Sequence, residues 1–141
     1  AFRNGPAALP GLRRVRDLAV AAAAEGRVST MEYATIFALL LVGHAIADYP
    51  LQGDFLAKAK NRANPIPGVP WFHGLLPHAA IHGGFVGMIT GNLWLGVAEF
   101  IVHCLIDDAK CMGRITYNTD QALHVACKLL WVLVLFWSAR P

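Results

Sequence analysis

Charged residues are scarce in this 141-residue chain. Lysine, arginine, aspartate and glutamate together make up 15% of it, whereas hydrophobic residues make up 56% and the mean hydropathy is +0.47. This composition lies toward the membrane side of ordinary globular usage. The formal net charge of +3 is modest, and no basic stripe or motif typical of a nucleic-acid-binding module is present. We therefore expect no nucleic-acid partner.

Cysteine is also rare. The three cysteines, Cys104, Cys111 and Cys127, form no CxxC motif and cannot all pair with one another. We interpret them as small apolar fillers rather than as redox or metal-binding groups. A convincing secretory signal is missing too, because the first apolar segment comes late and is not followed by a cleavage site. The length suits one compact domain.

Residues 1–30 differ from the rest of the chain. The stretch PGLRRVRDLAVAAAAEG, bounded by Pro10 and Gly26, has arginines early and an alanine run after them. This pattern predicts an amphipathic or soluble helix. Met31 is a plausible natural start, so we interpret residues 1–30 as a basic, alanine-rich extension without chemistry of its own. Residues 31–141 then form the main domain.

Four apolar segments follow. They run from about Tyr33 to Tyr49, His73 to Thr90, Leu93 to Ala109 and Thr119 to Trp137. Each approaches the ~20 residues that a membrane-spanning helix needs, and the polar groups within them must then face inward. A polar loop with three prolines separates the first two segments, which predicts irregular structure there. We expect an all-α fold, an up-down four-helix transmembrane bundle in a lipid bilayer, in preference to a soluble helical bundle.

Aromatic residues and glycines favour the same fold. Membrane-interface aromatics would lie at both ends of the bundle: Tyr49, Trp71 and Tyr117 at one end, Trp94 and Trp137 at the other. The second segment also carries glycines at a spacing of four, at Gly83, Gly87 and Gly91. Such a strip lets a neighbouring helix approach closely, as membrane helices often do.

Every apolar segment carries a pair of metal-ligand side chains four residues apart. The pairs are His44 with Asp48, His78 with His82, His103 with Asp107, and Asp120 with His124. Residues at this spacing lie on the same face of a helix, one turn apart. In an up-down bundle all four pairs fall at the same end. Glu99 extends the third pair backwards into the pattern E-x3-H-x3-D.

These residue types at one place predict a metal site. Buried carboxylates are unfavourable unless they are paired or bind a metal. A mixed histidine and carboxylate set without cysteine suits zinc best, with iron or manganese as alternatives. The number of candidate ligands fits either two ions, or one ion whose surplus neighbours orient its ligands. Structural alternatives that need no metal are hydrogen-bonded core histidines, a helix cap at Asp120 and polar clamps between helices.

The candidate ligands can be given expected roles. Direct ligands would be His44, Asp48, His103, Asp107 and His124, while His78 and Asp120 would bind the metal or orient its ligands. His82, Glu99 and Lys110 are the candidate catalytic groups, with His82 a proton shuttle or a further ligand. Lys110 and Gln121 would stabilise an anion or position a water, although Lys110 more readily extends to the membrane interface. We expect Asp54 and Asp108 to be solvated.

Four motifs resemble the domain-of-unknown-function 3307 family. They are H-x3-D-x2-LQ from His44, LPHAAIHG with His78 and His82, H-x3-D-x2-K from His103, and DQ-x2-H from Asp120. The resemblance runs from about Met31 to the end and implies a small helical membrane protein, bacterial or phage-encoded, with these polar positions at its centre. A bacterial inner membrane would be its location. A looser likeness to membrane-bound metal-dependent hydrolases is an analogy of fold.

Two functions remain open at this point. The leading hypothesis is a metal-dependent hydrolase that acts near the membrane interface on a lipid headgroup or lipid-linked phosphate, with phosphoester and amide hydrolysis both possible. The alternative is a non-catalytic membrane subunit, with a structural metal or polar clamp, that offers its outer face to partner helices. Metal or proton transport ranks last, because the stretches GMITGNLWLG and LLWVLVLFW provide almost no polar path across the bilayer.

Overall fold

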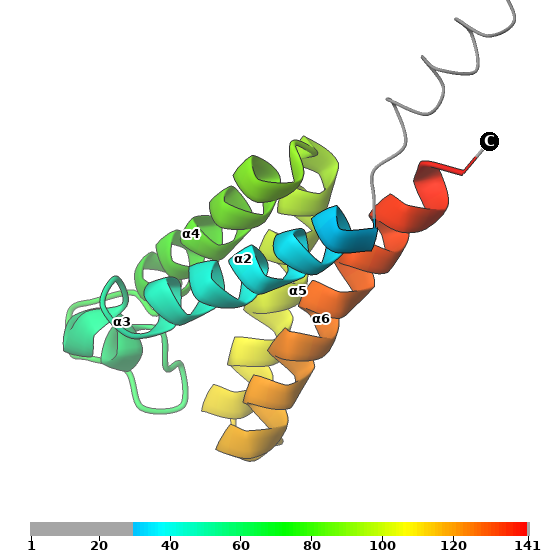
Figure 1. Ribbon diagram of the computed structural model, residues 1–141. Helices are drawn as coiled ribbons and strands as arrows, with labels where there is room; N and C mark the ends of the chain where they lie inside the picture. The colour runs from blue at the N-terminus through cyan, green and yellow to red at the C-terminus, as the bar shows by residue number, and fades with distance from the viewer. Residues whose placement is uncertain (1–29, 141) are drawn as a thin grey trace, which may run out of the picture.

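A computed structural model describes residues 30–140, which form five α-helices and no strand (Figure 1). The helices are α2 (Thr30–Asp48), α3 (Gly53–Ala59), α4 (Phe72–Thr90), α5 (Leu93–Cys111) and α6 (Tyr117–Ser138). The predicted all-α class is confirmed. The helix predicted within residues 1–30, like the rest of that extension up to residue 29, lies outside the described residues.

The four long helices form a closed ring of neighbours. Helix α2 packs against α4 and α6, and α5 packs against the same two helices from the other side. Successive long helices run in alternating directions along the chain (Figure 1). This arrangement brings the end of α2, the start of α4, the end of α5 and the start of α6 to a common end of the bundle.

A tight turn joins α4 to α5. Gly91 adopts a left-handed conformation at the end of α4, with φ of 63°, which glycine reaches without the steric penalty of a side chain. The Asn92 side chain then caps α5 by accepting hydrogen bonds from the backbone N–H groups of Trp94 and Leu95, at 3.0 and 3.2 Å. The prediction that Gly91 belongs to a helix-packing strip is therefore wrong, since Gly91 ends the helix.

The other two glycines of the strip do allow close helix packing. A Cβ atom on Gly83 of α4 would lie 2.7 Å from the carbonyl oxygen of Gly96 on α5. A Cβ on Gly96 would in turn lie 2.7 Å from the Gly83 carbonyl oxygen and 3.1 Å from the Gly87 Cα. Backbone meets backbone here, so any side chain would push the two helices apart.

The segment between α2 and α4 differs from the prediction of an irregular loop. Helix α3 forms from Gly53 to Ala59, and the prolines that rule out a long helix lie after it. Its last turn rests directly on α4, where a Cβ on Gly74 would lie only 2.5 Å from the backbone nitrogen of Lys60. This close approach brings Lys60 into the interior of the bundle.

The interior is apolar in one half and polar in the other. Leu40, Val86, Leu95, Trp131 and Val132 form the apolar core. The buried polar and charged side chains of the described residues are His44, Lys60, His78, His82, Glu99, His103, Asp107, Asp120, His124 and Lys128. Large apolar side chains point outward instead on all four long helices, for example Val42, Met88, Leu105 and Leu130.

One helix is long and apolar enough by itself to cross a membrane. Within the described part of the chain this is α6, while α2 and α3 pass the same test only as a pair that is bent by 85° between them. The predicted four-span bundle thus has four long helices, of which composition alone identifies one as a span.

Candidate metal centre

The structure brings all eight predicted ligands together at one end of the bundle. Two come from each long helix: His44 and Asp48 from α2, His78 and His82 from α4, His103 and Asp107 from α5, and Asp120 and His124 from α6. Seven of them, all except His44, fall in ligand groups whose candidate atoms lie within 4.8 Å of one another. The periodicity of the helices, one turn between the members of each pair, causes this convergence.

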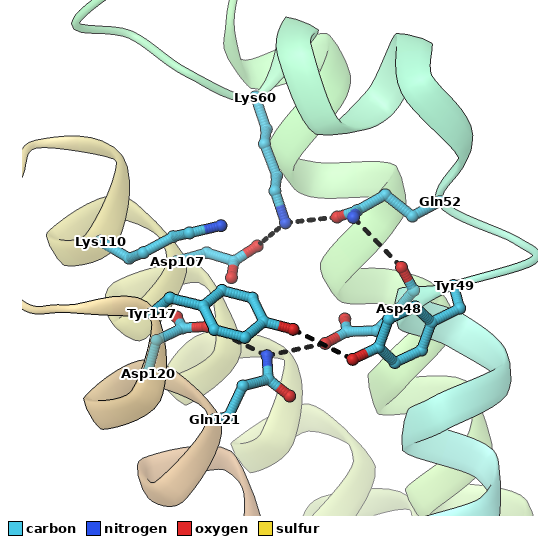
Figure 2. Close-up of a pocket in the computed structure, with 9 residues that line it drawn as sticks. All are labelled: Asp48, Tyr49, Gln52, Lys60, Asp107, Lys110, Tyr117, Asp120 and Gln121. Carbon is cyan, nitrogen blue, oxygen red and sulfur yellow. Dashed lines mark hydrogen bonds and ion pairs between the residues drawn. The ribbon is translucent and has the colours of Figure 1, made fainter.

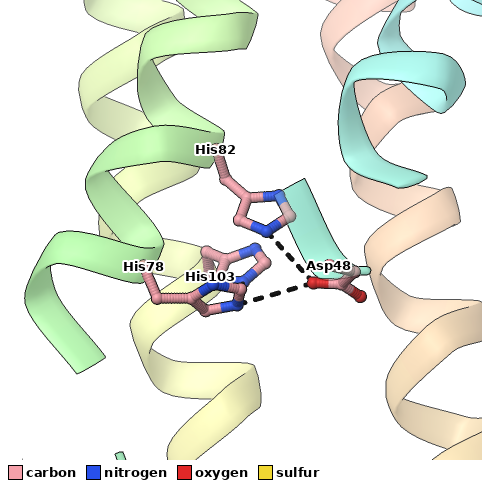
Figure 3. A group of neighbouring side chains, drawn as sticks. All are labelled: Asp48, His78, His82 and His103. Atoms are coloured by element: carbon pink, nitrogen blue, oxygen red, sulfur yellow. Dashed lines mark hydrogen bonds and ion pairs between the residues drawn. The ribbon is translucent and has the colours of Figure 1, made fainter. Parts of the chain in front are cut away.

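The first group contains Asp48, His78, His82 and His103 (Figure 3). Oδ1 of Asp48 lies 3.1 Å from Nε2 of His82 and 3.5 Å from Nε2 of His78. Nε2 of His78 lies 3.2 Å from Nε2 of His103. Two ligands bound to one tetrahedral zinc ion, each at about 2.0–2.1 Å, are themselves about 3.3 Å apart. The three distances therefore match three edges of a tetrahedral coordination shell.

The second group contains Asp107, Asp120 and His124. Nε2 of His124 lies 3.5 Å from Oδ1 of Asp120 and 3.6 Å from Oδ1 of Asp107. The other oxygen of Asp107, Oδ2, lies 3.4 Å from Nε2 of His78 in the first group. Asp107 thus faces both groups, and its Oδ2 also accepts a hydrogen bond from Lys60.

His44 belongs to the cluster but to neither of these groups. Its Nδ1 lies 3.3 Å from Nδ1 of His82, and its Nε2 lies 3.4 Å from Oδ2 of Asp48. It therefore contacts the ring nitrogen of His82 that faces away from the first group. A partner at the second ring nitrogen fixes the orientation of a metal-binding histidine. The position of His44 would suit such a partner, and its predicted role as a direct ligand stays a prediction.

Several buried polar atoms of the cluster have no aligned hydrogen bond. Among the proposed ligand atoms these are Nε2 of His82, Nε2 of His124 and Oδ1 of Asp120. Buried polar groups are nearly always satisfied, and such exceptions need an explanation. Imidazole nitrogens and carboxylate oxygens that converge without mutual hydrogen bonds suit a cation between them. The residues present therefore fit a divalent metal.

Glu99 lies on the same face of α5 but has other partners. Lys128 and Trp131, both buried on α6, donate hydrogen bonds to its two carboxylate oxygens, and the Trp131 bond measures 2.6 Å. Oε1 of Glu99 also lies 3.4 Å from Nδ1 of His103. A third group of Glu99, His103 and His124 is close enough for a metal, but it would compete with these donors. Glu99 instead faces Nδ1 of His103, the ring nitrogen that lies away from the first group.

A pocket of about 170 Å³ opens beside the second group (Figure 2). Its lining comes from the ends of α2, α5 and α6 and from the α3 segment, and consists of Asp48, Tyr49, Gln52, Lys60, Asp107, Lys110, Tyr117, Asp120 and Gln121. The hydroxyl groups of Tyr49 and Tyr117 share a hydrogen bond of 3.0 Å at its exposed side. Two of the three carboxylates in the lining, those of Asp107 and Asp120, are the oxygen ligands of the second group.

Amide and ammonium groups hold the carboxylates of the pocket. Nε2 of Gln121 donates hydrogen bonds of 3.1 Å to Oδ2 of both Asp48 and Asp120. The other oxygen of each aspartate, Oδ1, therefore faces the histidines. Nζ of Lys60, which is buried, donates to Oδ2 of Asp107 at 2.6 Å and to the side-chain oxygen of Gln52.

Sequence reasoning missed Lys60 and Lys128. Lys60 lies in the polar stretch between the first two apolar segments, where no sequence pattern marks it. Lys128, in contrast, stands four residues after His124, so Asp120, His124 and Lys128 repeat the spacing of Glu99, His103 and Asp107. This spacing predicts that Lys128 lies on the buried face of its helix, and it is the sequence signal that could have identified Lys128.

The remaining predicted residues lie around the centre. Lys110 is half-buried in the wall of the pocket, 5.7 Å from the centroid of the Tyr117 ring. Asp54 is exposed, as predicted. Asp108 was predicted to be solvated, but it is partly buried in an ion pair with Arg62. Hydrogen bonding to this carboxylate raises the pKa of the Arg62 guanidinium above its ordinary value.

The family resemblance is confirmed by comparison with known families. The sequence profile described as Protein of unknown function (DUF3307) matches residues 36–140. Because this match covers well over half of the chain, the chain belongs to the DUF3307 family. Comparisons with curated proteins and with solved structures give no match.

Proposed function

We propose that this DUF3307 family member is a membrane-embedded, metal-dependent hydrolase that acts near one membrane interface. The observation that carries the proposal is the spacing of Asp48, His78, His82 and His103. Three pairs of their ligand atoms lie 3.1–3.5 Å apart, as three edges of a tetrahedral coordination shell would. A polar clamp between helices would satisfy its buried atoms by hydrogen bonds, yet Nε2 of His82 has no aligned hydrogen bond.

The distribution of apolar side chains supports the membrane location. Each long helix has 19–22 residues, or about 28–33 Å at ~1.5 Å per residue, close to the ~30 Å thickness of a bilayer core. Leu105 of α5 and Met88 of α4 are 65% and 73% exposed, while the polar side chains face inward. Inward polar residues lower the average hydropathy of a helix but leave its outer face apolar, so a test based on composition alone undercounts such spans.

The two ligand groups suit different tasks. The first group offers four protein ligands, the number that closes a structural zinc site. The second offers three, Asp107, Asp120 and His124, beside the pocket, and so leaves a position open. An ion held by these three residues would bind water at the open position and lower its pKa toward ~7, which would supply the nucleophile for hydrolysis. Because Asp107 faces both groups, it would hold the two proposed ion positions at a fixed distance from each other.

Metal analysis of purified protein tests this proposal. We expect two equivalents of zinc, iron or manganese per chain in the unaltered protein, one in His78→Ala, one in Asp120→Asn, and none in a variant that combines His103→Ala with Asp107→Ala. His73→Ala is the matched control, since His73 lies on α4 but is exposed outside the cluster. A metal-free unaltered protein, prepared without chelators, would overturn the metal centre and the hydrolase together.

The four-ligand group also favours a second candidate function. A closed site is typical of structural metals, and the outward apolar faces suit partner helices in a larger membrane assembly. In that case His78→Ala, which removes a ligand of the four-ligand group, should lower stability and assembly together. In the hydrolase, Asp120→Asn should abolish turnover of membrane-derived esters or amides while the helical content and the metal of the first group persist.

A further inference from the structure

We propose that the pocket beside the second ligand group binds a phosphate group of the substrate, with Lys60 and Lys110 as its cationic walls. This inference rests on the proposed metal centre and names the class of substrate for that centre. Both lysines line the pocket together with Asp107 and Asp120. Figure 2 shows their side chains approaching Asp107 from different helical segments.

Lys60 has the features of a built binding group. Its side chain is 4% exposed, although burying an ammonium group is costly. Asp107 and the side-chain oxygen of Gln52 accept two of its hydrogen bonds, and a lysine ammonium has three N–H groups to donate. Close helix packing fixes the position of Lys60. Gly74 lets the backbone at Lys60 approach α4 within a distance that no side chain permits. Lys60 is thereby fixed at the pocket wall.

The charge of the pocket depends on the metal ions. Without them, the carboxylates of Asp48, Asp107 and Asp120 outnumber the two lysines in the lining. Divalent ions in both ligand groups reverse this balance, so that the two ammonium groups face the pocket with a surplus of positive charge. An anion next to the second group is then favoured by the ions and the lysines together.

Phosphate suits the directions of these donors. A phosphate group has acceptor oxygens that point several ways, and here it would meet Lys60 from the α3 segment, Lys110 from α5 and one hydroxyl of the Tyr49–Tyr117 pair, since the other hydroxyl donates within the pair. A planar carboxylate has two oxygens and would leave some of these donors unused. The pocket volume of about 170 Å³ admits a small headgroup rather than a large one. The proposed substrate is therefore a phosphate ester with a compact headgroup.

Binding of inorganic phosphate to the zinc-loaded protein tests the proposal. Titration calorimetry in detergent should detect phosphate binding, and Lys60→Met should weaken it at least tenfold. Lys58→Met is the matched control, since Lys58 lies two residues earlier with a side chain that is 71% exposed, and it should bind phosphate unchanged. Lys110 is half-buried in the pocket wall, and Lys110→Met should also weaken phosphate binding. This variant replaces Lys60→Met as the test if Lys60→Met does not fold.

The outcomes separate this inference from the proposed function. Metal content is measured on every sample, so a protein that lacks metal fails the metal centre itself. A zinc-loaded protein that does not bind phosphate, or that binds acetate equally well, overturns the phosphate site alone. The same holds if neither lysine variant weakens binding.

A second arm identifies the source of the phosphate group. Zinc-loaded protein is placed in nanodiscs of phosphatidylcholine, with or without phosphatidic acid, and phosphate binding is repeated. Competition by phosphatidic acid supports a lipid headgroup as the occupant. Unchanged phosphate binding in both nanodiscs supports a soluble phosphate ester, and loss of binding in both overturns the site in its membrane setting.

Discussion

Lys128 of α6 donates a hydrogen bond to Glu99 of α5, and both side chains are 1% exposed. This ion pair lies next to the histidine cluster, because Glu99 also lies 3.4 Å from Nδ1 of His103. A buried pair is weak support for stability as a whole, but losing one partner leaves an uncompensated charge in the interior. Removing Lys128 alone should therefore destabilise the protein.

Lys128→Met should lower the free energy of unfolding by about 3–5 kcal/mol, because it strands the Glu99 carboxylate. Combining Lys128→Met with Glu99→Gln should recover part of this loss, since neither charge remains. Denaturant unfolding in detergent micelles measures both variants. Losses that simply add would show that the two residues are not coupled. At saturating zinc the metal content of both variants should equal that of the unaltered protein, as neither residue is a proposed ligand.

Gly83→Ala should destabilise the packing of α4 on α5. The new Cβ would lie 2.7 Å from the backbone oxygen of Gly96, and a backbone atom cannot move aside as a flexible side chain can. We expect a loss of about 1–3 kcal/mol, the usual range for an overpacked interior. Gly84→Ala is the control, because its Cβ meets nothing within 4 Å, and helix propensity predicts a gain of up to about 1 kcal/mol. Equal unfolding free energies for the two variants would refute the close contact.

Gln121→Leu should weaken metal binding without removing a ligand. The Gln121 amide donates to Oδ2 of both Asp48 and Asp120, which leaves Oδ1 of each aspartate facing the histidines. Loss of such an outer partner typically lowers metal affinity about 10–100-fold. Competition with a chromogenic chelator measures this change. Asn118→Leu, an exposed amide near the start of the same helix, should leave the affinity unchanged, and an unchanged affinity in Gln121→Leu would contradict the orienting role.

Much of the centre followed from helical spacing alone. Two side chains four residues apart share a helix face, so His78 with His82 and Asp120 with His124 had to point the same way once α4 and α6 formed. The same rule, applied as far as Lys128, would also have found the partner of Glu99. The all-α class followed from the apolar segments in a similar way.

Other features depend on contacts that no local pattern encodes. Lys60 reaches Asp107 because α3 rests on Gly74 of α4, which only the packed structure reveals. The division of the ligands into two groups, and the place of His44 behind His82, depend on side-chain orientations across four helices. Gly91 was misjudged because a spacing of four does not separate a packing strip from a helix end.

Cysteine labelling in membranes should show which side chains face lipid. Leu105 and Leu130 point outward and are 65% and 49% exposed, so in a bilayer they should contact acyl chains. We replace each by cysteine in a variant whose three native cysteines are alanine, and treat permeabilised membranes with a charged maleimide. Both positions should react slowly, because the hydrocarbon core excludes the reagent and disfavours the thiolate. They should react readily once detergent and denaturant unfold the chain.

The control for this labelling is Asp54→Cys. Asp54 lies on α3, outside the four long helices, and its side chain is 97% exposed. We expect its cysteine to react rapidly in membranes and in detergent alike, because water reaches it in both. Rapid labelling at Leu105 and Leu130 in intact bilayers, at the rate of the Asp54 control, would contradict a lipid-facing surface. The outward apolar side chains would then face water, which contradicts the membrane location that both candidate functions require.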